Sequence, residues 1–179
     1  MIDKSWTLFL DRDGVINERL PGSYVTHWEE FVLKEDFMEA MKLFRNLFGR
    51  IIIVTNQQGI GKGLMTEVDL LNVHQYFENV LAKEGITIEA IYYCPHLAEE
   101  YCHCRKPNIG LAEKAKQDFS DIDFEKSIMV GDSLSDILFG KRSGMTTVYI
   151  GNEPPHIELN SGMMPDYYYK NILDFAHSL

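Results

Sequence analysis

Short apolar runs alternate with amphipathic stretches along most of the chain. The runs are four to six residues long and rich in Ile, Val, Phe and Leu, which is typical of buried strands. About five strands are predicted, at Thr7–Leu10, Ile51–Val54, Ile88–Tyr93, Ser127–Val130 and Thr147–Ile150. Because such runs alternate with helices, we expect right-handed crossovers and a parallel sheet with helices on both faces.

The amphipathic stretches carry recognisable helix ends. The first has a stripe of Phe and Met side chains and stops at Gly49, which we expect just after its C-cap. Thr66, with Asp69 three residues later, is expected to cap the second helix, and Gly144 to end the fourth. The helices are predicted at Asp36–Phe48, Thr66 to about Glu84, Ile109–Phe119, Ser135–Ser143 and Asn171–His177.

Polar residues follow three of the predicted strands where each strand ends. They are Asp11 and Asp13 after the first strand, Thr55 and Asn56 after the second, and Asp132 after the fourth. In parallel sheets, ligands bind at the carboxyl ends of the strands, near a switch in strand order. We therefore expect these side chains to meet at one edge of the sheet.

These residue types suit the chemistry of a phosphate ester. Asp11 could attack phosphorus, while Asp13 could protonate the leaving alcohol and later take a proton from water. Asp132 could complete an Mg²⁺ site with Asp11 and a backbone carbonyl, and the cation would offset the repulsion between carboxylate and phosphate. Donors to the phosphoryl oxygens are expected from Thr55 and Lys106.

Each of these motifs also has an ordinary structural interpretation. Asp-x-Asp-Gly is a common turn sequence, and Asp132 could simply cap a helix. Lys106 could be a solvated surface lysine. In the functional interpretation, Arg105 beside it adds a bidentate contact to a phosphate. The combination of all these groups at successive strand ends favours a catalytic site.

Charge limits the kinds of partner. The 179 residues carry 27 Asp and Glu against 17 Lys and Arg, for a formal charge of −10. Such a surface does not bind nucleic acid or anionic lipid by bulk charge. Because Asp3 and Lys4 interrupt the first apolar run, we expect no signal peptide and a cytoplasmic protein. An apolar content of 45% predicts one globular domain over residues 1–179.

Three cysteines lie within eleven residues, at positions 94, 102 and 104. An odd number at this spacing is a poor disulfide framework, so a metal site or a reducing compartment fits better.

Four motifs carry a family resemblance: DRDGVIN at 11–17, TNQQGIGKG at 55–63, CHCRKP at 102–107 and GDSLSD at 131–136. On these motifs the chain resembles the haloacid dehalogenase (HAD) superfamily of aspartyl-phosphate phosphatases. Within it, the chain is most similar to the capless branch, subclass IIIA, of heptose-bisphosphate and histidinol-phosphate phosphatases. The resemblance implies a Rossmann-like three-layer α/β fold with a mainly parallel sheet, no cap domain and a zinc-binding loop.

The resemblance also implies roles for individual residues. Asp11 would be the nucleophile that becomes aspartyl-phosphate, and Asp13 the general acid and base. Thr55 and Lys106 would steady the phosphoryl group, and Arg105 would contribute to substrate recognition. The Mg²⁺ ligands would be Asp11, the carbonyl oxygen of Asp13 and Asp132, with Asp136 orienting them from behind.

The cysteines gain a place in the same framework. Cys-x-His at 94–96 and Cys-x-Cys at 102–104 offer four ligands for a closed tetrahedral zinc site. The resemblance points to His96 as the fourth ligand beside Cys94, Cys102 and Cys104, with His103 turned away. This Zn²⁺ would be structural and would hold Arg105 and Lys106 beside the active site.

The resemblance favours the 7-phosphate of D-glycero-D-manno-heptose 1,7-bisphosphate as the group removed. Arg19 and Lys62 could meet the second phosphate of that sugar, although both could equally be solvated charges. Substrate contacts are expected from Arg19, Asn56, Gln57, Gln58, Lys62 and Arg105. A monomer that binds a small phosphorylated sugar, and neither nucleic acid nor membrane, is expected.

Three alternatives stay open at this point. Only five residues separate His96 from Cys102, a spacing closer to that of histidinol-phosphate phosphatases. A polynucleotide 3′-phosphatase has similar first motifs, but the charge of −10 and the lack of a basic stripe disfavour it. A zinc-stabilised binding module without activity would have lost a catalytic group, and none is missing.

Overall fold

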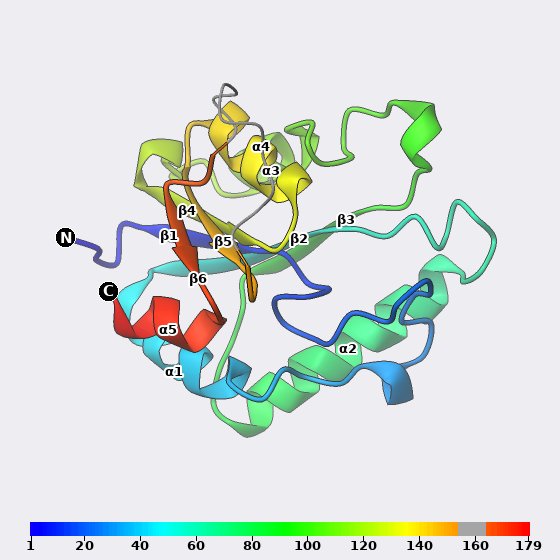
Figure 1. Ribbon diagram of the computed structural model, residues 1–179, viewed down its shortest axis with the longest axis horizontal. Helices are drawn as coiled ribbons and strands as arrows, with labels where there is room; N and C mark the ends of the chain where they lie inside the picture. The colour runs from blue at the N-terminus through cyan, green and yellow to red at the C-terminus, as the bar shows by residue number, and fades with distance from the viewer. Residues whose placement is uncertain (154–163) are drawn as a thin grey trace.

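A computed structural model describes residues 1–153 and 164–179, and a parallel sheet forms its centre (Figure 1). The six strands lie in the order β3-β2-β1-β4-β5-β6. They are β1 (Thr7–Leu10), β2 (Arg50–Asn56), β3 (Ala90–Cys94), β4 (Ser127–Gly131), β5 (Thr146–Ile150) and β6 (Tyr167–Tyr169). Every pairing in the sheet is parallel, as the sequence pattern predicts.

Helices cover both faces of the sheet. One face carries α1 (Phe37–Leu47), α2 (Glu67–Lys83) and α5 (Ile172–His177), and the other carries α3 (Gly110–Asp118) and α4 (Leu134–Ser143) (Figure 1). Three short 3₁₀ turns, η1 (Trp28–Glu30), η2 (Ala98–Glu100) and η3 (Phe124–Lys126), lie in the connections. The predicted three-layer arrangement is thus confirmed. In the described parts of the chain, no helix has both the length and the apolar character needed to cross a membrane.

Strand β1 is buried on both faces of the sheet, because its side chains point alternately into two hydrophobic cores. Leu8 and Leu10 pack with α1, α2 and α5, whereas Phe9 between them packs with α3 and α4. Each such side chain contributes roughly 1.5–3 kcal/mol when it leaves water. A strand buried on both faces reads as a continuous apolar run, which is why the pattern could locate it.

The three expected helix ends lie where the local sequence predicts. At the start of α2, Asp69 N donates to Thr66 Oγ1 at 3.1 Å, and Thr66 N donates to Asp69 Oδ2 at 2.8 Å. Gly144 ends α4 in the left-handed conformation, with φ 82°. Gly49 follows α1 as expected but for another reason: a methyl group there would lie 1.9 Å from the Lys4 carbonyl oxygen.

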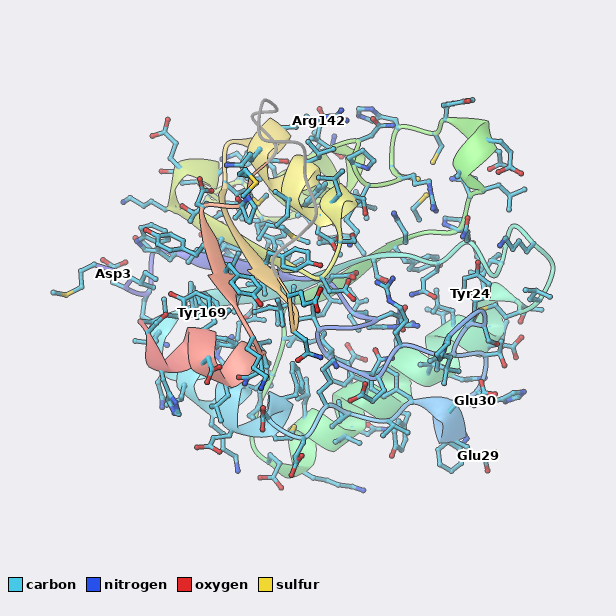
Figure 2. The ribbon with its side chains drawn as sticks, viewed as in Figure 1. Asp3, Tyr24, Glu29, Glu30, Arg142 and Tyr169 are labelled. Atoms are coloured by element: carbon cyan, nitrogen blue, oxygen red, sulfur yellow. The ribbon has the colours of Figure 1, made fainter. Side chains whose placement is uncertain are left out.

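A sixth strand, β6, lies at the edge of the sheet and was not predicted. It pairs only with β5, with Val148 opposite Tyr167. Tyr167 and Tyr168 remain 56% and 37% exposed, so this strand carries no buried apolar run. Tyr169 packs on Phe175 of α5, with ring centroids 5.5 Å apart (Figure 2).

The strand order places a switch point beside β1. The chain passes from β1 to β2 and β3 on one side, and then returns to β4 on the other side of β1. The crossovers therefore diverge at the carboxyl ends of β1 and β4, where a crevice forms in sheets of this kind.

Candidate active site

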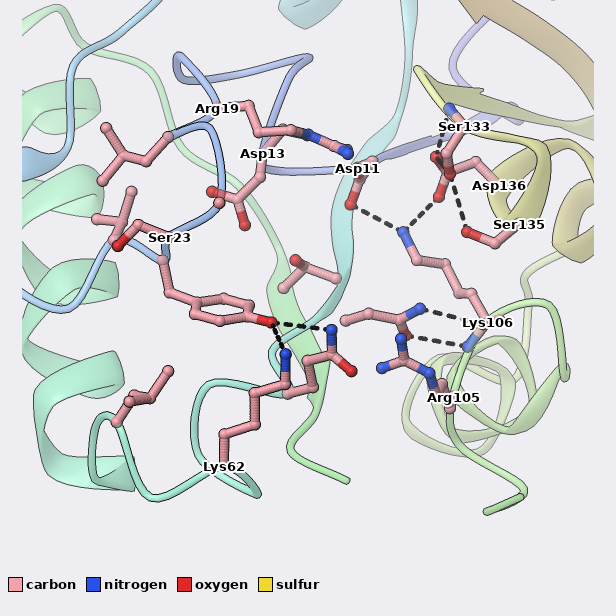
Figure 3. A pocket seen from close by; sticks show the side chains of 18 residues that line it. Asp11, Asp13, Arg19, Ser23, Lys62, Arg105, Lys106, Ser133, Ser135 and Asp136 are labelled. Atoms are coloured by element: carbon pink, nitrogen blue, oxygen red, sulfur yellow. Dashed lines mark hydrogen bonds and ion pairs between the residues drawn. The ribbon is translucent and has the colours of Figure 1, made fainter. Parts of the chain in front are cut away.

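Four of the five residues predicted at the strand ends line one cavity of about 490 Å³ (Figure 3). The connection between β1 and α1 and the loop after β2 form its other walls. The sequence-predicted residues that line it are Asp11, Asp13, Arg19, Thr55, Asn56, Gln58, Lys62, Arg105, Lys106 and Asp136. Asp132 lines a neighbouring cavity of about 410 Å³, and Arg19 lines both.

Lys106 is an almost completely buried charge of the site. Its Nζ donates to Asp11 Oδ1 at 2.8 Å and to Asp136 Oδ1 at 2.6 Å (Figure 3). It also donates to the Val54 carbonyl at 2.7 Å. Burial lowers the pKa of Lys106, but the two carboxylates outweigh it, so that the net pKa lies above the ordinary value. Lys106 is therefore a protonated lysine that bridges two carboxylates.

Asn56 anchors the backbone of Lys106 rather than reaching far into the cavity. Its Oδ1 accepts from Lys106 N, and its Nδ2 donates to Lys106 O, both at 3.0 Å. This pair of bonds joins the end of β2 to the loop that carries Lys106. Asn56 thereby fixes how the lysine enters the site.

Asp11 is buried at the end of β1. Burial, together with the charge of Asp136, raises the pKa of Asp11 to about 7, although the Lys106 ammonium opposes the shift. Asp136 is engaged on both oxygens, because Oδ2 accepts from the Ser133 amide at 3.1 Å and from its hydroxyl at 2.5 Å. Asp11 is thus the carboxylate that faces the cavity with an oxygen still available.

The carboxylate of Asp13 accepts hydrogen bonds from several neighbouring side chains. Arg12 Nη2 donates to both carboxylate oxygens, at 2.8 and 2.9 Å, and Asn17 Nδ2 donates to Oδ1 at 2.9 Å. Burial raises the pKa of Asp13, whereas the charge of Arg12 lowers it. With the added hydrogen bonds, the net pKa lies below the usual range, so Asp13 is a carboxylate in this state.

Two residues behind Asp13 were not anticipated from the sequence. Arg12 is 1% exposed, and its Nη1 lies 3.3 Å from His74 Nε2 on α2. Burial first, and then the charge of Arg12, lower the pKa of His74 to about 3, so the ring is neutral and its Nε2 accepts from Arg12. The only signal in the sequence was a histidine next to Val73 and Phe77 on an otherwise apolar helix face.

Gln57 does not reach the cavity, although it was expected to contact substrate. The side chain is 1% exposed, and its Nε2 donates to Asp13 Oδ2 and to Thr55 Oγ1, both at 2.8 Å. Because the Thr55 oxygen accepts from Gln57, the Thr55 proton is free to point elsewhere. Gln57 therefore aligns two cavity residues from behind.

Arg19 reaches back towards the strand ends and lies beside Asp13 and Asp11 in Figure 3. Its Nη2 donates to Asp132 Oδ1 at 2.8 Å and to the Asp13 carbonyl at 3.1 Å. Burial raises the pKa of Asp132 to about 6, while the charge of Arg19 opposes the rise. Gly14, at φ +98°, makes room for this carboxylate: a methyl group there would lie 1.9 Å from Asp132 Oδ2.

The acidic residues fit a divalent cation. Oxygens of Asp11, Asp132 and Asp136 lie within 4.8 Å of one another, and Mg²⁺ prefers carboxylate and carbonyl oxygens. Asp136 is already engaged by Lys106 and Ser133. Asp136 is thus engaged on both oxygens, which leaves Asp11, Asp132 and the carbonyl oxygen of Asp13 as donors, although Arg19 contacts the last two.

A second cluster of possible metal ligands lies beside the cavity. The Sγ of Cys94 is 3.2 Å from that of Cys102 and 3.0 Å from that of Cys104, and His96 Nδ1 is 3.3 Å from Cys104 Sγ. Disulfide sulfurs lie roughly 2.05 Å apart, so these thiols are not bonded in pairs. Three sulfurs and one imidazole nitrogen are the donor set of a closed zinc site. His103 turns away and contacts Glu113.

The end of the cavity away from Asp11 is built around a tyrosine that sequence reasoning missed. Lys62 Nζ and Gln58 Nε2 each donate to Tyr24 Oη at 2.9 Å (Figure 3). Tyr24 lies in the connection between β1 and α1, on the side of the molecule opposite Asp3 (Figure 2). Arg105, whose Nη1 donates to the His96 carbonyl at 3.3 Å, faces the same cavity.

Comparisons with known proteins agree with this geometry. A family model described as "HAD-hyrolase-like" matches residues 103–175. The chain is 43% identical over 132 residues to D-glycero-alpha-D-manno-heptose-1,7-bisphosphate 7-phosphatase of Mycobacterium bovis, which covers 74% of this chain and 70% of that relative. It is 41% identical over 150 residues to the Campylobacter jejuni protein of the same name, with 84% of each chain covered.

A solved structure is similar over nearly the whole chain. The D,D-heptose 1,7-bisphosphate phosphatase of B. bronchiseptica, solved with magnesium and phosphate, superimposes with a TM-score of 0.84 at 27% identity. The alignment covers 97% of each chain.

Proposed function

Because the chain belongs to the HAD-like family of D-glycero-D-manno-heptose-1,7-bisphosphate 7-phosphatases, we propose that it hydrolyses the 7-phosphate ester of a heptose 1,7-bisphosphate. The observation that carries the proposal is the meeting of Asp11, Asp13, Thr55 and Lys106 in one cavity at the switch point of the sheet. A nucleophile, an acid-base group and two phosphoryl donors are what a phosphatase of this kind needs.

In the proposed first step, a carboxylate oxygen of Asp11 attacks phosphorus. The bond between phosphorus and the sugar oxygen breaks, and Asp13 donates a proton to the departing alkoxide. In the second step Asp13 takes a proton from water, the water oxygen attacks the aspartyl-phosphate, and inorganic phosphate leaves. Asp11 and Asp13 return to their starting forms.

Asp13 must gain a proton before it can act as the acid. In the free enzyme its pKa is held low, chiefly by Arg12 against the effect of burial. An arriving phosphate dianion would act as a neighbouring like charge and raise the pKa of Asp13. The same carboxylate would then be an acid with substrate present and a base once the alcohol has left.

Lys106 and Thr55 would hold the transferring phosphoryl group. Lys106 Nζ is already beside the attacking carboxylate, 2.8 Å from Asp11 Oδ1. The Thr55 hydroxyl has its oxygen occupied by Gln57, which leaves its proton for a phosphoryl oxygen. Donors placed before the reaction stabilise the developing charge without reorganising during it.

For the cation, we propose Asp11, the Asp13 carbonyl and Asp132 as Mg²⁺ ligands, with Asp136 behind them. When bound, Mg²⁺ keeps Asp11 ionised and offsets the repulsion between this carboxylate and the phosphate dianion. The donor chemistry and the proximity of the carboxylates support this assignment.

We further propose a structural zinc at Cys94, His96, Cys102 and Cys104. Four protein ligands close the coordination sphere, so this ion would take no direct part in the reaction. Arg105 follows Cys104 directly and Lys106 comes next in the chain. The zinc would hold this segment against the end of β2.

The second phosphate of the substrate requires a separate binding site with positively charged and hydrogen-bond-donating side chains. Lys62 and Gln58, paired through Tyr24, offer one at the end of the cavity away from Asp11, and Arg105 faces the same space. These residues are proposed to hold the sugar phosphate that is not cleaved. One chain supplies all the residues that the proposed reaction uses, so the reaction would need no second copy and a monomer would suffice.

The test compares substrates on the purified protein with Mg²⁺. Phosphate release is measured from both anomers of heptose 1,7-bisphosphate, from histidinol phosphate and from a 3′-phosphorylated oligonucleotide. We expect kcat/KM to be highest for one heptose anomer, and Asp11→Asn to abolish turnover. A higher kcat/KM for histidinol phosphate would overturn the assigned substrate, and full activity of Asp11→Asn would overturn the covalent mechanism.

A further inference from the structure

Arg19 occupies the space between two oxygens that the proposed function assigns to the metal. Its Nη2 lies 2.8 Å from Asp132 Oδ1 and 3.1 Å from the Asp13 carbonyl oxygen. One nitrogen thus bridges a carboxylate and a carbonyl that leave different strands. A cation held by the same two oxygens would have to enter the same space.

The charges around the site account for the position of Arg19. Asp11, Asp132 and Asp136 crowd together, and Lys106 bonds only the first and last of them. Asp132 is left to Arg19, with which it forms an ion pair at 2.8 Å. Arg19 therefore supplies the positive charge that faces Asp132.

The acceptors of this contact are fixed, whereas the arginine is not. Asp132 lies against Gly14, and the Asp13 carbonyl is part of a backbone turn in which Gly14 N donates to Asn17 O at 2.8 Å. The Arg19 side chain is 55% exposed and lines both neighbouring cavities. It can therefore leave Asp132 and still stay in the wall of the active-site cavity.

We propose that Arg19 is an internal competitor of Mg²⁺. In the metal-free enzyme its guanidinium takes the place of the cation, and metal binding displaces it into the cavity, where it becomes available to a substrate phosphate. The proposal rests on the proposed function, because it takes the metal ligands from there. Mg²⁺ ligands lie at roughly 2.1 Å, so an ion held by both oxygens would displace the Nη2 group from the position between them.

Competition of this kind links the metal to the substrate. Removal of Arg19 from Asp132 is part of the cost of binding Mg²⁺, so the measured affinity is lower than that of the bare ligands. An anion that draws Arg19 into the cavity would lower this cost, and linkage requires the metal to favour the anion by the same factor. Arg19 thus favours a site in which cation and phosphate bind together.

The test titrates Mg²⁺ alone into the enzyme by calorimetry. Mg²⁺ is first removed by dialysis without a strong chelator, so that the cysteine cluster is not stripped. Because exposed ion pairs are weak, we expect Arg19→Ala and Arg19→Gln to bind Mg²⁺ about two- to fivefold more tightly than the wild type. The metal-free variants should also melt at a lower temperature and gain more from Mg²⁺.

Lys62→Ala is the matched control, since it removes one positive charge from the same cavity without touching Asp132. Its Mg²⁺ affinity should change by less than half as much as that of Arg19→Ala. Unchanged or weaker Mg²⁺ binding by Arg19→Ala would overturn the competition, and so would an equal effect of Lys62→Ala. If Asp132→Asn also binds Mg²⁺ as the wild type does, the metal assignment in the proposed function is what fails.

Discussion

Lys106 Nζ lies 2.8 Å from Asp11 Oδ1, although 95 residues separate the two in the chain. Both side chains are almost completely buried, at 2% and 8% exposure. The ammonium also bonds Asp136, so its positive charge offsets the repulsion between the two buried carboxylates. Removing it would leave both carboxylates without the buried cation that they share.

We therefore expect Lys106→Met to lose both activity and stability. Loss of one positioned donor lowers kcat by about 10²–10³-fold, and an uncompensated buried charge costs roughly 3–5 kcal/mol. Phosphate release and urea unfolding measure the two effects. Lys114→Met is the control, because Lys114 pairs with Asp118 on the surface of α3 and should change stability by at most about 0.5 kcal/mol. Wild-type stability of Lys106→Met would contradict this account.

Gln57→Glu should disturb Asp13 and Thr55 at the same time. The substitution places an oxygen where Nε2 now donates to both residues at 2.8 Å, so the bond to Asp13 becomes a repulsive contact and the Thr55 hydroxyl must turn its proton away from the cavity to donate to the new carboxylate. We expect stability to fall by about 1–3 kcal/mol. We also expect the acid limb of the kcat–pH profile to move to higher pH, because the added negative charge raises the pKa of Asp13. Gln75→Glu on the exposed face of α2 serves as control and should leave the profile in place.

His74 should make the fold sensitive to acid. Its pKa is lowered to about 3 by burial and by Arg12, whereas an unfolded histidine titrates near about 6.5. Between these values the unfolded chain binds a proton on this histidine that the native chain does not, so the contribution of His74 to stability falls as the pH falls below 6.5, whereas the raised pKa values of Asp11 and Asp132 act in the opposite direction. The loss is about 1.4 kcal/mol per pH unit, or about 2 kcal/mol between pH 6.5 and 5.

Urea unfolding at pH 6.5 and 5 measures this loss against two variants. On going from pH 6.5 to pH 5, the change in stability of His74→Gln should be more favourable than that of the wild type by about the stated amount. His177→Gln removes an exposed histidine from α5 and should keep the wild-type slope. Equal slopes in His74→Gln and the wild type would rule out His74 as the source.

The cysteine cluster should bind zinc in near-stoichiometric amount. We expect Cys102→Ser to lose the metal and to loosen the segment that carries Arg105 and Lys106, with loss of activity. Elemental analysis of fresh protein gives the zinc content directly. His103→Asn changes a histidine that lies between two of the cysteines but faces Glu113, so this variant should retain its zinc. Wild-type protein without zinc would end the proposal.

Gly14→Ala should weaken the metal site beyond the cost of backbone strain. Both Gly14 and Gly85 have positive φ, at 98° and 71°, but only at Gly14 does a methyl group collide with another residue, Asp132. Each Ala variant should lose roughly 1–2 kcal/mol of stability from its left-handed conformation. Only Gly14→Ala should also bind Mg²⁺ more weakly, by calorimetry, and equal Mg²⁺ affinity in the two variants would contradict the role of Gly14.

The local sequence was enough to predict the main elements and the chemistry of the strand ends. Apolar periodicity depends on near neighbours, so the runs before Asp11 and Asp132 and the Thr66–Asp69 cap could be located without the fold. Parallel crossovers then bring strand ends to one edge by general topology. This is why Asp11 and Thr55 could be placed together in advance.

The tertiary structure alone decided which partners these groups take. Arg19 meets Asp132 across 113 residues, and Arg12 meets His74 across 62. Such contacts depend on register, on the path of loops and on which side chain fills a space, and these are global properties. For the same reason β6 escaped prediction: its pairing with β5 requires an open sheet edge, which no local apolar pattern records.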